Sequence, residues 1–194
     1  MRKLIVSEFT SLDGVMQAPG GPEEDTDGGF AHGGWTLPYW HDDIGTRFFE
    51  AMAECDAFLL GRRTWESHSI FETFEEGDPF GDLMKGMQKY VVSTTLESAD
   101  AWRNSTIIRD NVVEEVRRLK QQEGKSIYID GSSVLIHELA RHGLIDEYSL
   151  LVYPLVLGGG KRVFEDGPRV DMALVETRTF PTGVVLMRYA VNHD

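Results

Sequence analysis

The sequence is short of cysteine, of long apolar segments and of positive charge. Its 194 residues include a single cysteine, Cys55, so no disulfide can form within the chain, and a reducing compartment is expected. No stretch approaches the roughly 18 consecutive apolar residues of a membrane-spanning helix. The N-terminal MRKLIVSEFTSLDG lacks the long apolar core of a signal peptide. These absences predict a cytoplasmic protein that does not contact a membrane.

Positive charge is scarce, because 19 Lys and Arg residues face 32 Asp and Glu residues and give a formal net charge of −13. Such a chain repels nucleic acid and anionic membranes, so neither is an expected partner. Any anionic ligand would have to be held by a local positive site. This makes the adjacent Arg62 and Arg63, directly after the apolar DAFLLG, the feature that most needs an explanation.

Several motifs of catalysis and metal binding are also missing. The sequence has no G-x-G-x-x-G dinucleotide fingerprint and no G-x-S-x-G nucleophile elbow. The segment GGGKR at 158–162 resembles only part of a P-loop and can be either a turn or a ligand contact. His137 and His142 are five residues apart, so they point away from each other on a helix, and no metal site is expected. We expect Cys55 to be a buried structural thiol.

The spacing of apolar residues predicts strands alternating with helices along most of the chain. Strands are predicted at 3–9, 57–60, 89–94, 105–109, 126–130 and 145–158, and helices at 42–55, from 62 onward, at 111–122 with Asn111 as N-cap, and at 134–143 ending at Gly143. Segments 20–34 and 72–86 are predicted to be long loops, the second with room for one helical turn. Residues 173–191 predict a hairpin turned around Pro181 to Gly183. The pattern indicates an α/β sandwich with a mostly parallel sheet and an antiparallel C-terminal edge.

Small polar residues follow three of the predicted strands. They are Gly61, Arg62, Arg63 and Thr64 after the strand at 57–60, Ser93 and Thr94 after KYVV, and Gly131, Ser132 and Ser133 after the strand at 126–130. Ligands of open α/β sheets bind at the carboxyl ends of strands, and a helix N-terminus with guanidinium groups suits phosphate. Three such edges indicate a long ligand with several phosphate and ribose groups, such as a nicotinamide dinucleotide. Each alone has an ordinary structural explanation, since paired arginines are often surface charge and Gly-Ser-Ser is a common helix start.

Three quoted segments carry a resemblance to known enzymes. LLGRRTWES at 59–67 resembles the cofactor-binding segment of the dihydrofolate reductases. SLDGVMQ at 11–17 and YIDGSSVLIHELARHGLIDEYSLLVYPLVLGGGKRVF at 128–164 resemble the reductase domain of riboflavin-biosynthesis enzymes, which shares the dihydrofolate reductase fold. The resemblance runs from Leu4 to the final hairpin. It implies one domain over 1–194, a three-layer sandwich with a central mixed sheet and helices on both faces, and NADPH lying across the carboxyl ends of the strands.

The resemblance also implies roles for individual residues. Gly61, Arg62, Arg63 and Thr64 would hold the pyrophosphate and the adenosine 2′-phosphate, Ser93 and Thr94 would lie near the adenosine, and Gly131, Ser132, Ser133 and Val134 would pass under the pyrophosphate and the nicotinamide. An arginine at the 2′-phosphate favours NADPH over NADH. Asp13 fills the place of an aspartate near the nicotinamide and substrate, although it can equally be a turn residue before Gly14. Trp35 and Asp43 are the expected substrate residues, with Trp35 as part of a pocket wall.

Two departures from these enzymes bear on the function. The dihydrofolate reductases have paired glycines before the last cofactor helix, and here Asp130-Gly131 stands instead, which puts the unusual backbone at that turn in doubt and brings a negative charge close to phosphate. Neither Asp42 nor Asp43 aligns with the carboxylate of the folate enzymes, which argues against folate reduction.

The leading hypothesis is therefore an NADPH-dependent reductase acting on a small heterocyclic or ribosyl substrate. The aminouracil ribosyl phosphate of the riboflavin pathway is the first candidate substrate that the resemblance implies. Two alternatives stay open: a non-catalytic nucleotide- or ligand-binding member of the fold, and a true dihydrofolate reductase. A homodimer is also expected, because SLLVYPLVL at 149–157 is predicted to form an apolar sheet edge that needs covering.

Overall fold

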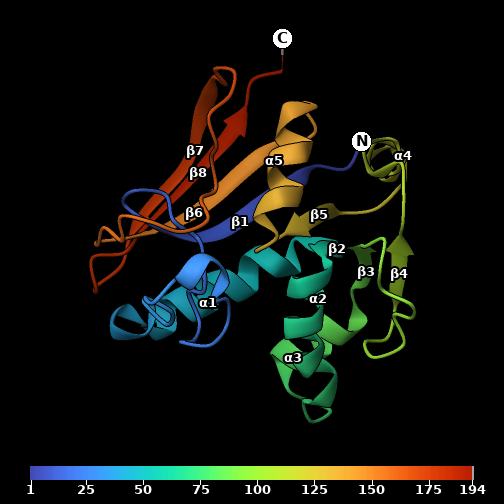
Figure 1. Cartoon of the computed structure of the whole chain (residues 1–194), viewed down its shortest axis with the longest axis horizontal. Coiled ribbons are helices and arrows are strands. Elements are labelled where there is room, and N and C mark those ends of the chain that lie inside the picture. Colours follow the sequence, from blue (N-terminus) through green and yellow to red (C-terminus); the bar gives the residue numbers. More distant parts are fainter. Residues whose placement is uncertain (194) are drawn as a thin grey trace.

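The computed structural model describes residues 1–193 and contains one eight-stranded sheet in the order β4-β3-β2-β5-β1-β6-β8-β7 (Figure 1). The strands are β1 (Leu4–Ser11), β2 (Cys55–Gly61), β3 (Gln88–Val92), β4 (Ser105–Ile108), β5 (Ser126–Ile129), β6 (Glu147–Tyr153), β7 (Met172–Thr179) and β8 (Val185–Val191). Strands β1 to β6 pair in parallel, and β8 lies antiparallel between β6 and β7. This confirms the predicted mixed sheet and its antiparallel C-terminal hairpin.

Helices cover both faces of the sheet and make three layers. They are α1 (Asp42–Ala53), α2 (Arg62–His68), α3 (Pro79–Gly86), α4 (Val112–Gln121) and α5 (Ser133–Arg141), with 3-10 turns at Asp27–Gly29, Leu37–Tyr39 and Ser69–Thr73. Strand side chains alternate between two cores, so Leu59 packs with α4 and α5 while its neighbour Phe58 packs with α1, α2 and α3. Within residues 1–193, no helix is both long enough and apolar enough to cross a membrane.

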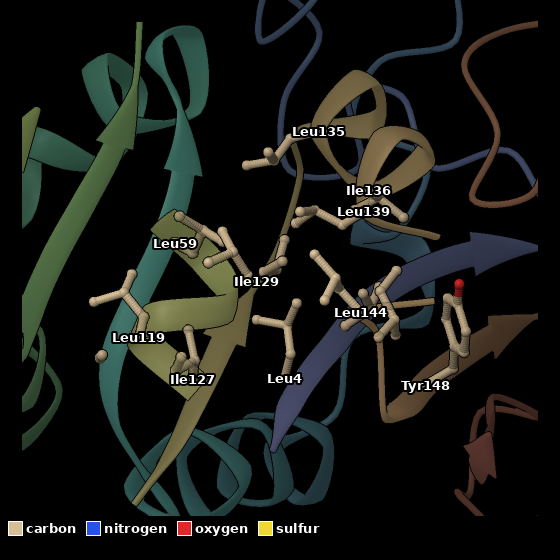
Figure 2. Packing of buried hydrophobic residues seen from close by; sticks show 14 of the residues in the cluster. Leu4, Leu59, Leu119, Ile127, Ile129, Leu135, Ile136, Leu139, Leu144 and Tyr148 are labelled. Atoms are coloured by element: carbon tan, nitrogen blue, oxygen red, sulfur yellow. The ribbon is translucent and has the colours of Figure 1, made fainter. Parts of the chain in front are cut away.

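The core beneath α4 and α5 fixes the strands that carry the candidate site. Figure 2 shows Leu119 of α4 and Ile136 of α5 in one buried cluster with Leu4 of β1 and Ile127 of β5. All four side chains are almost completely buried, and each contributes about 1.5–3 kcal/mol through removal of apolar surface from water. The strands β1 and β5, which lead to the candidate site, are therefore anchored in a packed core at their amino ends.

The segment at 72–86 is more helical than its composition predicts. It contains α3, which begins with Pro79 after an N-cap at Asp78, whose carboxylate accepts a hydrogen bond from the Gly81 amide at 2.7 Å. A Cβ at position 81 would lie 2.7 Å from the Phe74 Cβ, so the glycine permits close packing between this helix and the preceding turn. The prediction of a loop with room for one helical turn underestimated the helix, because α3 extends over eight residues.

Two predictions about helix ends had different outcomes. Gly143 ends α5 in the left-handed region at φ +62°, and its amide donates to the Ala140 carbonyl at 3.0 Å, as predicted. Asn111 precedes α4, but its side chain caps nothing in the helix and instead donates to the Asp110 carboxylate at 3.2 Å. Asn111 is thus the N-cap residue of α4 as predicted, but with a left-handed backbone at φ +49° and without a side-chain capping hydrogen bond.

The sheet edge lies elsewhere than the sequence predicts. Strand β6 ends at Tyr153, before Pro154, and it pairs with β1 on one side and β8 on the other. The apolar segment 149–157 therefore forms no sheet edge, and the reason given for a homodimer was wrong. The C-terminal edge is β7, which exposes Leu174 and Val175. Dimer formation itself stays a prediction.

Candidate functional site

The ends of β2 and β5 meet through a small hydrogen-bond network. The Gly61 amide donates to Ser132 Oγ at 2.8 Å, and the Ser132 hydroxyl donates to Thr64 Oγ1 at 3.0 Å. Because β2 and β5 pair in parallel, their carboxyl ends reach the same edge of the sheet. The structure thus brings together residues from two of the three predicted strand ends.

The turn after β5 has an unusual backbone. Gly131 and Ser132 both lie in the left-handed region, at φ +56° and +59°. A Cβ on Gly131 would lie 2.8 Å from Thr64 Oγ1, so only glycine fits there. At Ser132 the left-handed backbone costs about 1–2 kcal/mol, which the two hydrogen bonds of its hydroxyl offset. The doubt raised by Asp130-Gly131 is thereby answered, since one glycine followed by Ser132 forms the turn.

Helix α5 begins directly after this turn. Ser133, its first residue, is buried, whereas the apolar side chain of Val134 is 80% exposed. Val134 is therefore available to contact a ligand at the start of the helix. The cofactor contacts that the resemblance implies for Ser133 and Val134 stay predictions.

The negative charge of Asp130 has a partner within the protein. The carboxylate of this buried residue lies 3.3 Å from Nε2 of His68, the last residue of α2. Burial disfavours the charged imidazole, but the adjacent Asp130 carboxylate outweighs it, so the pKa of His68 is raised. Because the raised pKa favours a positive charge on His68, this pair reduces the conflict between Asp130 and a phosphate at the same turn.

The two arginines have different surroundings. Arg62 pairs with Glu66 of its own helix at 3.0 Å, whereas Arg63 pairs with Asp27 of the loop at 20–34. Lys161 joins this loop as well, with Nζ 2.6 Å from Asp25 and 2.8 Å from Asp27. We call Arg63, Lys161, Asp25 and Asp27 the ionic cluster. Its cations are partly neutralised by the two carboxylates, yet the Arg63 side chain is 67% exposed.

Ser93 and Thr94 lie at the same edge, beside the end of β2. Val92 pairs with Gly61 in the parallel register of β2 and β3, and Ser93 follows directly. The buried Ser93 hydroxyl accepts hydrogen bonds from the amides of Leu96 at 2.9 Å and Thr95 at 3.2 Å. Ser93 therefore shapes the turn, and only the exposed Thr94 offers its side chain to a ligand.

Asp13 ties the turn after β1 to the loop after β6. Its carboxylate accepts hydrogen bonds from the Ser11 hydroxyl at 2.6 Å and from the amides of Leu157 and Gly158 at 3.1 and 2.9 Å. The Ser11 hydroxyl and, after an opposing effect of burial, these amides lower the pKa of Asp13 to about 2. Asp13 is ionised at neutral pH and cannot act as a proton donor. The predicted catalytic role of Asp13 could therefore come only from its negative charge, and it stays a prediction.

The two expected substrate residues face other groups. Trp35 is only 6% exposed, donates its indole N–H to the Gln17 carbonyl at 2.8 Å and packs edge-on against Tyr153. Asp43 lies in the first turn of α1, 3.7 Å from Arg178. Their substrate roles stay predictions, and in this structure the Trp35 ring is covered by the core.

A site residue that the sequence reasoning missed is Glu8. It lies in β1, is buried, and its Oε1 has no hydrogen-bond partner among residues 1–193. The signal was present, because an acidic residue interrupts the apolar alternation of the strand KLIVSEF. The prediction of a strand at 3–9 gave Glu8 no role.

The remaining candidates have structural surroundings. Cys55 is buried, and burial raises its pKa to about 12, so its thiol is unreactive at neutral pH. His137 contacts the Arg162 carbonyl at 2.9 Å, and His142 contacts Glu138. Across residues 1–193, no three His, Cys, Asp or Glu side chains are grouped so that they could hold a metal ion.

Two surface hollows lie away from the sheet edge. One of about 550 Å³ lies between α5 and the segment 163–172, and one of about 530 Å³ lies beside α3 and Arg103. Neither is lined by a residue predicted for the site. We place the candidate site at the sheet edge rather than in these hollows, because only the edge joins Gly61, Thr64 and Ser132.

An α/β domain with the dihydrofolate reductase fold is the class that this sheet defines. Residues 2–186 match the family model of the RibD C-terminal domain, and the chain belongs to that family. It is 32% identical to the uncharacterized protein YyaP of Bacillus subtilis (strain 168), over 98% of this chain and 96% of that protein.

Solved structures with the same fold include two proteins whose names state different functions. A putative riboflavin biosynthesis protein from Shewanella sp. PV-4 superposes with a TM-score of 0.75 at 20% identity, over 98% of this chain and 99% of that one. The dihydrofolate reductase of Enterococcus faecalis, complexed with NADP(H) and RAB-propyl, superposes with a TM-score of 0.62 at 16% identity, over 98% and 97% of the two chains. At these identities the likeness shows the fold alone.

Proposed function

We propose that the protein is an NADPH-dependent reductase that transfers hydride to a small heterocyclic or ribosyl substrate. The aminouracil ribosyl phosphate of the riboflavin pathway is the first compound to test, because the chain belongs to the RibD C-terminal domain family. The observation that carries the proposal is the joining of Gly61, Thr64 and Ser132 at the start of α5.

The residues at this edge fit a nicotinamide dinucleotide. The absence of a Cβ at Gly131 keeps the turn open beside Thr64, and the free N–H groups of α5 suit a pyrophosphate. Arg63 supplies an exposed guanidinium for a 2′-phosphate, and Thr94 supplies a hydroxyl toward the adenosine side. The exposed Val134 would pack against the cofactor.

The cofactor and the protein would have separate roles in the reaction. A reduced nicotinamide supplies the hydride, and the protein supplies binding, orientation and electrostatics. The Gly131–Ser132 turn would orient the cofactor, and Asp27 ties the 20–34 loop to Lys161 and Arg63 beside it. Asp13 holds the adjoining loop in place through the Leu157 and Gly158 amides.

Cofactor titrations test this proposal directly. We expect NADPH to bind more tightly than NADH in isothermal titration calorimetry. Arg63→Ala should weaken NADPH binding by about tenfold or more, since a charge-assisted hydrogen bond contributes about 1.5–3 kcal/mol, and it should leave NADH binding nearly unchanged.

Arg117→Ala is the matched control, because Arg117 is a similarly exposed arginine on α4 with one acidic partner, Glu114. It removes the same charge far from the sheet edge and should change neither affinity. Failure of both nucleotides to bind the wild type would contradict the reductase proposal. NADPH binding without turnover of the aminouracil compound or dihydrofolate would favour the non-catalytic alternative.

A further inference from the structure

Strand β1 pairs with β5 along only the first part of its length. Its pairing with β5 ends at Val6, whereas its pairing with β6 continues to Ser11. After Ile129 the chain leaves the sheet through the turn at 130–132. The second half of β1 therefore borders the carboxyl end of β5, beside the proposed cofactor turn. Glu8 lies on this stretch, two residues beyond Val6.

The Glu8 side chain is buried there with one of its two carboxyl oxygens unpaired. It is only 6% exposed, and Oε1 is wholly covered and has no hydrogen-bond partner among residues 1–193. Burying a polar atom without a partner costs stability, and such groups in native proteins call for an explanation. An apolar side chain such as that of Val6 would fill the same space at lower cost. A purely structural role therefore does not account for Glu8.

Burial and the neighbouring carboxylates favour the protonated form of Glu8. Burial raises the pKa of Glu8 well above its usual value, and the Asp130 carboxylate and, more weakly, Glu24 of the covering loop add to this shift, while the Gly131 amide opposes it. The β6 residue opposite Glu8 is Leu150, which carries no charge. His68 is paired with Asp130, and Tyr128 of β5 is neutral because burial raises its pKa as well.

The pKa values of two carboxyl groups near the end of β1 are thus shifted in opposite directions. Asp13 is ionised, with a pKa of about 2, and accepts hydrogen bonds from a hydroxyl and two amides. The pKa of Glu8 is raised well above its usual value, and its Oε1 has no hydrogen-bond partner among residues 1–193. Where environments drive the pKa values of two acids apart, the protonated one is the acid of the site.

We propose that Glu8 is the proton donor of the candidate site, acting on the nitrogen or oxygen of the C=N or C=O group that is reduced. This proposal rests on the reductase function proposed above. Reduced nicotinamide supplies the hydride to carbon. The electron pair of the double bond moves to the heteroatom, the O–H bond of Glu8 breaks, and a new N–H or O–H bond forms. The carboxylate left between Asp130 and Glu24 then takes a proton from water before the next turnover.

The test compares Glu8→Gln with Glu147→Gln. Glu147 is the matched control, since it is an equally buried carboxyl on β6 but is paired with Arg188 at 2.8 Å. Infrared spectroscopy at neutral pH should show the C=O stretch of a protonated carboxyl in the wild type. This band should be absent from Glu8→Gln and present in Glu147→Gln. It should also shift when 5-amino-6-(5-phosphoribosylamino)uracil binds together with NADP⁺.

Stability gives a second readout that is independent of any ligand. With its raised pKa in the folded state, Glu8 makes the wild type lose stability as pH rises above the ordinary glutamate pKa of about 4.3. Glu8→Gln should remove this loss and unfold no more easily than the wild type at neutral pH. Glu147→Gln should unfold more easily, because it leaves Arg188 with less compensation.

Single-turnover reduction of the same aminouracil compound gives the third readout. Glu8→Gln should slow reduction about a hundredfold or more while NADPH affinity stays unchanged. Glu8→Asp keeps an acid on a shorter side chain and should recover part of the rate.

The possible results separate the two proposals. A missing carboxyl band, a band that does not respond to the compound, or an unchanged rate in Glu8→Gln would overturn the role of Glu8 and leave NADPH binding standing. Wild-type protein that binds no NADPH would overturn both. Loss of the band together with a slowed rate and intact NADPH binding would support both.

Discussion

The two sides of the candidate site are held by different forces. The turn after β5 is joined to β2 by hydrogen bonds between neutral groups, with Ser132 between Gly61 and Thr64. The ionic cluster ties Arg63 and Lys161 to the 20–34 loop through two exposed carboxylates. The first side is partly buried and sterically tight, whereas the second is open to water.

This difference indicates which side is preformed. A turn that excludes even a Cβ cannot adapt to its ligand, so it must have its final shape before the cofactor arrives. Exposed ion pairs are weak and are screened by salt, so they can exchange one anion for another. Asp27 beside Arg63 therefore stands where a phosphate could replace it.

The largest effect should come from Gly131→Ala, which breaks the preformed side. The new Cβ would lie 2.8 Å from Thr64 Oγ1, and the residue would keep φ near +56°. We expect a loss of about 2–4 kcal/mol in the free energy of unfolding, with NADPH binding abolished. Chemical denaturation and calorimetry measure these two effects.

Gly143→Ala is the control that separates the backbone strain of a left-handed alanine from the steric clash of its Cβ with Thr64. Gly143 has a similar φ of +62°, but a Cβ there meets nothing within 4 Å. Its substitution should cost only about 1 kcal/mol and leave nucleotide binding intact. Equal losses in the two variants would show that the contact with Thr64 has no importance, and the turn would not be sterically fixed.

A smaller effect is expected from Asp13→Asn. This variant sharpens the comparison because the Asp13 carboxylate accepts hydrogen bonds from one hydroxyl and two amides, with the Arg162 guanidinium further away at 3.5 Å. The pKa of Asp13 is lowered to about 2 in the folded state, against about 3.9 when unfolded. Its contribution to stability is therefore present above pH about 4 and is lost as pH falls toward 2. The substitution should cost about 1 kcal/mol at neutral pH.

Urea denaturation at several pH values checks this expectation. The stability curves of the wild type and Asp13→Asn should converge as pH falls from about 4 to about 2. Ser98→Ala is a suitable control, because the Ser98 hydroxyl donates to an exposed aspartate far from this loop. A constant gap between wild type and Asp13→Asn at all pH values would mean that the charge of Asp13 contributes nothing.

Much of the preformed side could be predicted from sequence. Small residues at 61–64 and 131–133 follow apolar strands, and parallel strands bring their ends to one edge. The order of strands in the sheet and the hydrogen bond from Gly61 to Ser132 could not be predicted, because they join residues 71 positions apart. Periodicity describes each segment alone and does not say which segments meet.

The ionic cluster and Glu8 show the limits more clearly. Nothing local connects Asp27 with Arg63 or Lys161, since these pairs depend on where a long loop packs. The sequence shows that an acidic residue, Glu8, interrupts an apolar strand. It does not show the raised pKa of Glu8, which depends on burial and on Asp130 at the end of another strand. The same reason explains the wrong dimer argument, because the position of β6 inside the sheet is set by β1 and β8.

The smallest effect should come from Asp27→Asn, which breaks the exchangeable side. Removing this carboxylate frees Arg63 and Lys161 from a competing anion, so NADPH affinity should rise about two- to fivefold at low salt. The gain should shrink as ionic strength rises, because these groups are exposed and screened. NADH lacks the 2′-phosphate and should gain less. Asp25→Asn is the matched comparison, since Asp25 contacts only Lys161 of the two cations and should give a smaller increase. A fall in NADPH affinity in Asp27→Asn would instead show that the loop must be tied to Arg63 for binding, and the ionic cluster would then be as preformed as the turn opposite it.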